Sequence, residues 1–174
     1  MIFAVVGPSG AGKDTLIAGA MRARPGLRLV RRVITRPAEA GGEDFEGVTE
    51  ADFAARKARG DFALDWQAHG LRYGIPRAQT EGPGTVIFNG SRAALPQAVR
   101  VFPGLRVILV TAPDAVLAAR LAARGRETEA DICARLSRAA FTLPAGIAAS
   151  VVTNDSTPGE GLARLLAALQ LVSA

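Results

Sequence analysis

The sequence predicts an α/β fold in which helices cover both faces of a central parallel sheet. Short apolar, β-branched runs alternate with stretches of helical periodicity along most of the chain. Such alternation requires crossover connections, which place successive strands parallel to one another. The chain has 174 residues, of which 49% are hydrophobic. It is therefore long and apolar enough to form one domain, residues 1–174, with a sizeable core.

The predicted elements follow one another in a regular order. Strands are expected at residues 2–6, 86–88, 107–111 and 150–154, and helices at 13–24, 93–101, 113–124, 129–140 and 158–172. Pro113 stands at the first turn of its helix, where a fixed φ angle and a missing N–H are tolerated. Thr128 directly precedes the next helix.

Residues 33–84 interrupt this order. They contain a loop rich in Gly and Glu at 38–47, a helix at 50–59, and short segments that end at Tyr73 and Pro76. We interpret them as an insertion within the same domain, placed over the carboxyl edge of the sheet. Ligands bind at that edge in open α/β folds.

Composition restricts the possible functions. Cys133 is the one cysteine, which excludes an internal disulfide and suits a reducing, cytoplasmic location. We expect neither a leader peptide nor a membrane span. The formal net charge is +5, and Lys13 and Lys57 are the two lysines among 21 basic residues. Aromatic residues make up 5%, and the arginines are spread along the chain, so an anionic small molecule is favoured over nucleic acid.

The segment GPSGAGKDT has the spacing of a phosphate-binding loop. Gly7 is followed by four residues and then by Gly12 and Lys13. The loop follows a predicted buried strand and opens a helix, which is the arrangement that supports the assignment. Backbone N–H groups and the helix N-terminus can surround phosphates there, while the lysine meets the β- and γ-phosphates. The predicted nucleotide contacts are Gly7, Pro8, Ser9, Gly10, Ala11, Gly12, Lys13, Asp14 and Thr15.

Asp14 occupies the position where a Ser or Thr hydroxyl usually binds Mg²⁺. Three roles are open for it. Its carboxylate can hold a metal-bound water, can bind the metal directly, or can serve as an acid in the first turn of the helix. Thr15, one position later, can still offer a hydroxyl to a phosphate.

Several segments together resemble the guanylate-kinase-like enzymes, and most closely the ribose 1,5-bisphosphate phosphokinases among them. They are GPSGAGKDT, VITRP (33–37), WQAHGLRYG (66–74), FNGSRAALPQA (88–98), ARGRETEADICARLSRA (123–139) and TND (153–155). The resemblance runs from residue 2 to about 156. It implies a three-layer P-loop fold with an acceptor-binding insertion at 33–84 and a helical lid at about 120–138. It also implies ATP and Mg²⁺, and it makes Asp14 a family variant.

Departures from true guanylate kinases indicate an acceptor without a base. The second phosphate-binding Arg and the Tyr after their TR motif are missing from AEAGGEDFEGV. Asp65 stands in place of their guanine-reading Glu, and Asn89 in place of a strand-end acid. The resemblance therefore implies transfer of phosphate from ATP to ribose 1,5-bisphosphate, giving 5-phosphoribosyl 1-diphosphate (PRPP) in phosphonate breakdown.

The resemblance also assigns roles to individual residues. Arg36 and Tyr73 match acceptor-phosphate contacts, and Asn154 matches a residue near the adenine. The lid arginines that match contacts to the transferring phosphoryl group are Arg120, Arg124 and Arg126, with Arg135 matching a further one after the lid. For each arginine the alternative is a solvated helix face.

Three residues after a strand end are also candidates for the acceptor site. Asn89, Ser91 and Arg92 could reach a ribose hydroxyl or a phosphate, or could form a helix-capping turn. His69 is interpreted as a turn residue, with a substrate contact as the alternative. A phosphate acceptor is already an anion and needs no general base; a sugar-hydroxyl kinase would need one, and Asp65 could serve.

Two other functions remain open from the sequence. One is a guanylate kinase or another nucleoside monophosphate kinase. The other is a guanylate-kinase-like binding module without catalysis, although such modules typically lose the glycine-rich loop or its lysine, and both are present here. The sequence leaves the oligomeric state open.

Overall fold

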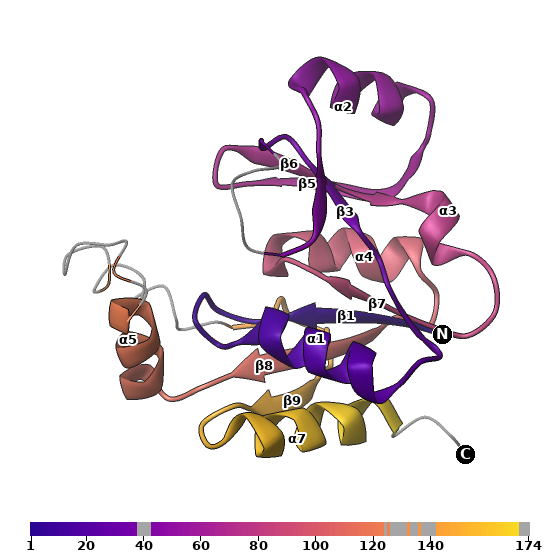
Figure 1. Cartoon of the computed structure of the whole chain (residues 1–174). Coiled ribbons are helices and arrows are strands. Elements are labelled where there is room, and N and C mark those ends of the chain that lie inside the picture. Colours follow the sequence, from indigo (N-terminus) through magenta and orange to yellow (C-terminus); the bar gives the residue numbers. More distant parts are fainter. Residues whose placement is uncertain (38–42, 124, 126–131, 133–135, 137–141, 171–174) are drawn as a thin grey trace. The chain divides into compact units, whose positions relative to one another are not determined.

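A computed structural model describes the chain except for residues 38–42, 124, 126–131, 133–135, 137–141 and 171–174 (Figure 1). It forms two compact units, one made of residues 1–4 and 25–106 and the other of residues 5–24 and 107–174. A five-stranded sheet has the order β2-β7-β1-β8-β9. Its ladders β2–β7 and β8–β9 are both parallel, as the alternation of elements predicts. Among the described residues, no helix is both long and apolar enough to cross a membrane.

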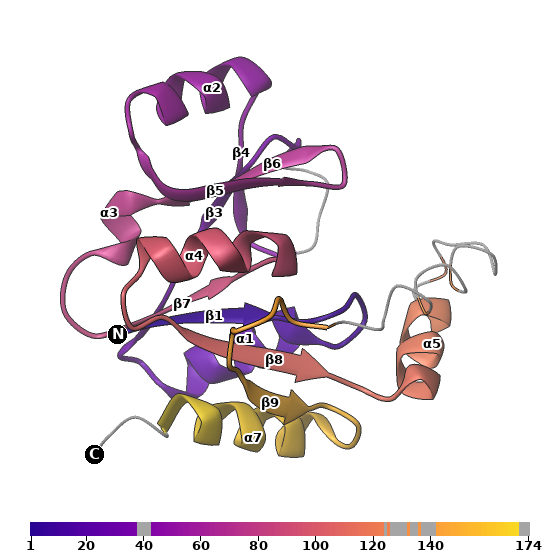
Figure 2. The same ribbon diagram turned by 180° about the vertical axis from the view of Figure 1, so that it is seen from behind.

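The unit with residues 5–24 and 107–174 carries the glycine-rich loop. Its elements are the end of β1 (Ile2–Val6), α1 (Lys13–Ala23), β8 (Arg106–Thr111), α5 (Asp114–Ala123), β9 (Ser150–Thr153) and α7 (Pro158–Gln170). Helices α1 and α7 lie side by side in both views (Figures 1 and 2), and a Cβ atom on Gly19 of α1 would lie 3.1 Å from a methyl carbon of Leu162 of α7. Val5, Val6 and Leu165 are fully buried, as expected for a strand and a helix that both face the core.

The unit with residues 1–4 and 25–106 holds the remaining elements. They are β2 (Leu27–Leu29), β3 (Arg32–Ile34), β4 (Phe45–Gly47), α2 (Glu50–Ala58), β5 (Phe62–Ala68), β6 (Leu71–Pro76), α3 (Arg77–Thr80), β7 (Thr85–Asn89), a 3₁₀ turn (Arg92–Ala94) and α4 (Leu95–Val101).

Four of these strands form a second sheet with the order β4-β3-β6-β5. Strand β3 pairs with β4 in parallel and with β6 antiparallel, and β5 and β6 form a hairpin. Its two-residue turn is His69–Gly70, and both residues have positive φ angles of 53° and 74°. Such a pair is typical of the type I′ turn, whose twist matches that of the strands. The structure thus confirms the interpretation of His69 as a turn residue.

Alternation of side chains gives this second sheet two different faces. One face carries Val33, which packs with Phe53 of α2 and with Phe62, so that α2 lies over it (Figure 2). The other face carries Arg32, together with the stacked rings of Trp66 and Tyr73.

Most expected elements are confirmed within two or three residues of their bounds. The second sheet is the main feature that the sequence did not predict, and the loop expected over 38–47 is wrong at its end, because Phe45–Gly47 is β4. Strands β3 and β4 have three residues each, too few to show a clear period of two. The helix expected over 129–140 falls largely outside the described residues.

Candidate active site

The glycine-rich loop has a backbone that side chains would obstruct. A Cβ atom on Gly7 would collide with the carbonyl oxygen of Val110 on β8, and one on Gly12 would lie 2.5 Å from the Nδ2 atom of Asn154. Gly10 and Gly12 also have φ angles of 85° and 86°, which L side chains rarely adopt. The loop therefore requires these glycines for its shape.

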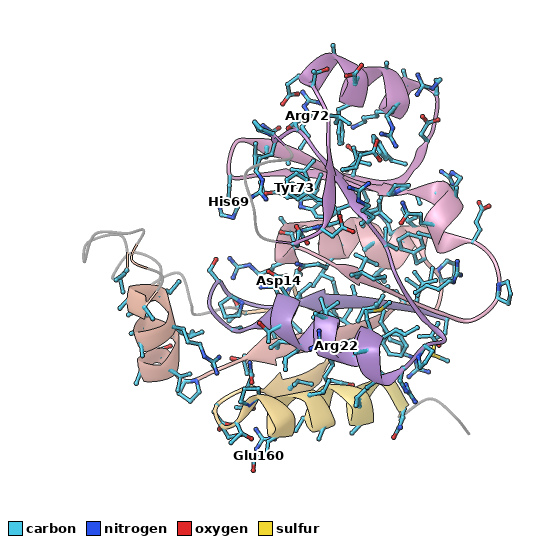
Figure 3. The ribbon with its side chains drawn as sticks, in the orientation of Figure 1. Asp14, Arg22, His69, Arg72, Tyr73 and Glu160 are labelled. Carbon is cyan, nitrogen blue, oxygen red and sulfur yellow. The ribbon has the colours of Figure 1, made fainter. Side chains whose placement is uncertain are left out.

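Lys13 begins α1 and folds back over the loop. Its ammonium donates hydrogen bonds to the carbonyl oxygens of Gly7 (2.9 Å) and Pro8 (3.2 Å). The ammonium group of the lysine that is predicted to meet the β- and γ-phosphates therefore lies beside the first residues of the loop. Asp14 is exposed in the first turn of α1, as Figure 3 shows, and Thr15 follows it.

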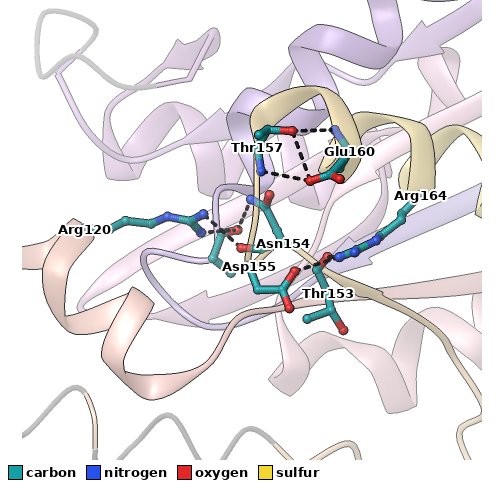
Figure 4. Close-up of polar contacts among 8 residues, drawn as sticks. Arg120, Thr153, Asn154, Asp155, Thr157, Glu160 and Arg164 are labelled. Atoms are coloured by element: carbon teal, nitrogen blue, oxygen red, sulfur yellow. Dashed lines mark hydrogen bonds and ion pairs between the residues drawn. The ribbon is translucent and has the colours of Figure 1, made fainter.

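Arg120 and Asn154 form hydrogen bonds to the backbone of the glycine-rich loop (Figure 4). The Arg120 guanidinium donates to the carbonyl oxygens of Gly10 and Ala11 at 3.4 Å each, and to that of Asn154 at 2.9 Å. Asn154 is 6% exposed, and its side-chain amide donates to the Ala11 carbonyl at 2.8 Å. The loop is therefore fastened to α5 and to the turn before α7, and Arg120 is bonded to protein rather than lying on a solvated helix face.

The turn before α7 begins the helix with a capping box. The Thr157 hydroxyl accepts from the Glu160 N–H at 3.3 Å, and the Glu160 carboxylate accepts from the Thr157 N–H at 3.3 Å. Hydrogen bonds from Ser156 and from Thr157 lower the pKa of Glu160. A side-chain hydrogen bond from Arg164 lowers the pKa of Asp155 in the same turn.

A cavity of about 300 Å³ lies beside the loop within this unit. Gly10, Gly12 and Thr15 of the predicted phosphate loop lie on its wall, together with Arg120 and Asn154, which the resemblance places at the nucleotide. The full lining is Gly10, Gly12, Thr15, Leu16, Arg120, Ala123, Asn154, Ser156 and Pro158. Among the described residues there is no cluster of three or more His, Cys, Asp or Glu that could hold a metal ion.

In the other unit, Tyr73 and Asn89 both contact Arg32, a residue that was not predicted to belong to the site. Arg32 lies with its guanidinium 5.2 Å from the Tyr73 ring centre and donates to the Asn89 carbonyl oxygen at 3.0 Å. Glu43 forms an ion pair with Arg32 and accepts from the Asn89 amide at 3.2 Å. A charged residue in a short strand of otherwise apolar residues was the available signal for Arg32; we find none for Glu43.

The structure does not bring Asp65 together with Tyr73. Asp65 alternates with Trp66 along β5, so its side chain points to the opposite face of the sheet. There its carboxylate forms an ion pair with Lys57 of α2 at 2.6 Å. Arg36 follows β3, with its guanidinium 4.3 Å from the centre of the Phe45 ring.

The residues after β7 form a capping turn. Ser91 precedes the 3₁₀ turn, and its hydroxyl accepts from the Ala93 N–H at 3.3 Å. This is the capping alternative stated for Ser91, and Arg92 begins the same turn. The predicted lid residues Arg124, Arg126 and Arg135 lie outside the described residues.

Solved structures share this fold. The guanylate kinase from Anaplasma phagocytophilum is 16% identical, with a TM-score of 0.67 over 99% of this chain and 87% of that chain. A sugar kinase from Janibacter sp. HTCC2649 is 17% identical, with a TM-score of 0.51 over 98% and 95% of the two chains. At these identities the likeness concerns the fold alone, and with the glycine-rich loop between β1 and α1 it defines a P-loop kinase fold.

Curated relatives are far more similar in sequence, although no family model matches the chain. Ribose 1,5-bisphosphate phosphokinase PhnN from Ruegeria sp. (strain TM1040) is 56% identical over 149 residues, which cover 84% of this chain and 78% of the relative. The protein of the same name from Agrobacterium fabrum is 45% identical over 157 residues, or 87% and 86% of the two chains. This chain belongs to the ribose 1,5-bisphosphate phosphokinase family.

Some relatives are longer. A bifunctional ribose 1,5-bisphosphokinase-thymidine phosphorylase from Cupriavidus pinatubonensis is 49% identical over 174 residues. The match covers 97% of this chain and 29% of that protein, so the chain spans less than a third of this bifunctional relative.

Proposed function

We propose that this protein transfers the γ-phosphoryl group of ATP to the 1-phosphate of ribose 1,5-bisphosphate, giving PRPP and ADP. The bond between the γ-phosphorus and the β–γ bridging oxygen breaks, and a bond from a 1-phosphate oxygen to the γ-phosphorus forms. That oxygen is already an anion, so no proton has to be removed. The observation that carries the proposal is the fastened phosphate loop with Lys13, in a chain up to 56% identical to enzymes of this name.

The loop residues suit the phosphates of ATP. Positive φ angles at Gly10 and Gly12 and the tight approach at Gly7 give the curved backbone that such loops use to aim N–H groups at phosphate oxygens. The Lys13 ammonium can exchange its two carbonyl partners for phosphate oxygens, because ammonium-to-phosphate bonds are charge-assisted and stronger. The cavity lined by Asn154 and Arg120 offers room for the rest of the nucleotide.

Mg²⁺, arriving with ATP, would neutralise charge on the β- and γ-phosphates. Asp14 is exposed at the start of α1, where a carboxylate can hold a water of the metal's shell. Direct binding of the metal and a purely structural role at the helix start are the other two roles, and a magnesium titration separates them.

The acceptor side is assigned to Arg36, Tyr73 and Asn89. Arg36 and Tyr73 would hold the acceptor phosphates, and Asn89, at the carboxyl end of β7, a ribose hydroxyl. The ion pair between Asp65 and Lys57 fits a reaction that needs no carboxylate base. Arg124, Arg126 and Arg135 would neutralise charge on the transferring phosphoryl group, as the lid arginines of such kinases do.

The proposal includes a cellular setting, which the need for ATP supports. We place the enzyme in the cytoplasm, where ATP is available, and in the breakdown of phosphonates. The partner it requires is a phosphorylated ribose.

The test is a phosphoryl-transfer assay with ATP and Mg²⁺. Ribose 1,5-bisphosphate, ribose 5-phosphate, GMP and AMP are offered separately, and the product is identified as PRPP by mass. We expect turnover with ribose 1,5-bisphosphate and at least 100-fold lower kcat/KM, on the order of 3 kcal/mol, with the others. Preferred turnover of GMP or AMP would instead indicate a nucleoside monophosphate kinase, and no turnover with any acceptor a binding module.

A further inference from the structure

A partly buried ion pair in the unit of residues 1–4 and 25–106 lies outside the residues assigned above to the reaction. Arg32 of β3 is 9% exposed, and the Glu43 side chain is 19% exposed. The guanidinium of Arg32 contacts one carboxylate oxygen of Glu43, and the Asn89 amide donates to the other at 3.2 Å. Glu43 is therefore held at both oxygens by donors from two different strands.

The surroundings of Arg32 fix it in place. Its guanidinium lies 5.9 Å from the ring centre of Trp66 and 5.2 Å from that of Tyr73, and the two rings stack with planes 5° apart. A second donor bond, to the Asn89 carbonyl oxygen at 3.0 Å, sets its direction. A planar cation over aromatic faces with directed bonds has little freedom to turn, so Glu43 is presented in one orientation.

The chemistry of Glu43 decides what it can recognise. An ionised carboxylate only accepts hydrogen bonds, and its two oxygens offer about four lone-pair positions. Arg32 and Asn89 use one position on each oxygen. The remaining capacity, on a side chain that is still partly exposed, suits hydroxyl donors and repels phosphate. A pair of adjacent hydroxyls matches the two oxygens of one carboxylate.

We infer that Glu43 is a specificity-determining residue that accepts hydrogen bonds from the adjacent ring hydroxyls of the acceptor pentose. Arg32 and Asn89 are its positioning residues. The inference rests on the proposed function, because it assigns the ribose of that acceptor to Glu43. It also explains why a carboxylate is present in a region that has to admit a bisphosphate: the charge is neutralised by Arg32, and its free positions face hydroxyls.

The test compares substrates that differ by one hydroxyl. The kcat/KM is measured for ribose 1,5-bisphosphate and for its 2-deoxy and 3-deoxy analogues, with wild type and with Glu43→Gln. Wild type should prefer the ribose compound over at least one analogue by roughly 10- to 100-fold, as expected for a hydrogen bond to a charged group. Glu43→Gln should reduce that preference to within about threefold, while the KM for ATP changes little. General damage to the fold would lower all three kcat/KM values equally and leave their ratios unchanged.

Asp44→Asn is the matched control. Asp44 is the next residue, and its carboxylate, 77% exposed, pairs with Arg31 rather than Arg32. This variant should keep the wild-type preference. If Glu43→Gln does not fold, Glu43→Asp is tested instead. This variant keeps the negative charge opposite Arg32, but its side chain is one methylene shorter. It should also lose the preference for the ribose compound.

The outcomes separate this inference from the proposed function. Wild type without turnover of ribose 1,5-bisphosphate would overturn the proposed function itself. Turnover with no preference among the three compounds, or a preference that Glu43→Gln keeps, would overturn the role of Glu43 alone. A lower KM for all three compounds in Glu43→Gln would also overturn it, since the carboxylate would then be competing with an acceptor phosphate for Arg32.

Discussion

Replacing Asn154 by alanine should both destabilise the protein and loosen its phosphate loop. Asn154 is 6% exposed, and its side-chain amide donates to the Ala11 carbonyl at 2.8 Å. Loss of such a bond costs about 1 kcal/mol. The space left between Gly12 and Gly161, which both approach this side chain closely, adds about 1 kcal/mol of lost packing. A total near 2 kcal/mol corresponds to a decrease in Tm of about 4–8 °C for a chain of this length.

Thermal unfolding followed by circular dichroism measures the first effect, and the KM for ATP measures the second. The KM should rise, because a loop that is flexible in the free protein has to be ordered when ATP binds, and this ordering reduces the affinity. Arg164→Ala in α7 is the control, because the Arg164 side chain bonds to the residues on either side of Asn154. Its bonds to Thr153 and Asp155 involve a side chain that is 46% exposed, so its Tm should change much less. Equal decreases for the two variants, or an unchanged Tm for Asn154→Ala, would refute this reasoning.

Three further predictions concern the loop and its surroundings. Lys13→Ala should keep the fold but lower kcat on the order of 10³-fold or more, and near-normal turnover of the folded variant would exclude a catalytic loop. Asp14→Ser should keep activity with an altered requirement for free Mg²⁺, and Asp14→Ala should lose more; superimposable magnesium titrations of all three proteins would exclude a metal role. Because its bond to Arg164 lowers the pKa of Asp155, this carboxylate stabilises the fold above its ordinary pKa of 3.8, and the contribution is lost as the pH falls through the lowered value. Unfolding measured between about pH 6 and pH 3 should therefore depend slightly less on pH in Asp155→Asn, and identical profiles would contradict this.

The glycine-rich loop could be predicted in detail because its parts are adjacent in sequence. A buried strand, three glycines and a lysine at the start of a helix make up the predicted phosphate site within about 15 residues. The structure adds why the glycines are required, through the close approach of Val110 at Gly7 and of Asn154 at Gly12. Neither neighbour could be identified from the loop itself.

The acceptor side was harder to predict for a physical reason. Asp65 and Trp66 are adjacent in sequence, yet one meets Lys57 of α2 and the other meets Arg32. A strand sends neighbouring side chains to opposite faces, and the pairing with other strands decides which face meets which group. The second sheet that sets this register was not predicted, because two of its strands are only three residues long.

The sequence by itself determined the fold class, the phosphate loop and the resemblance to a kinase family, since each depends on local spacing and periodicity. The tertiary structure decided which distant residues meet. Arg120 and Asn154 reach the loop across more than 100 residues, and Glu43 joins Arg32 of β3 to Asn89 of β7. Such contacts depend on strand register and on the direction in which each helix leaves the sheet, and neither is encoded in a short stretch of sequence.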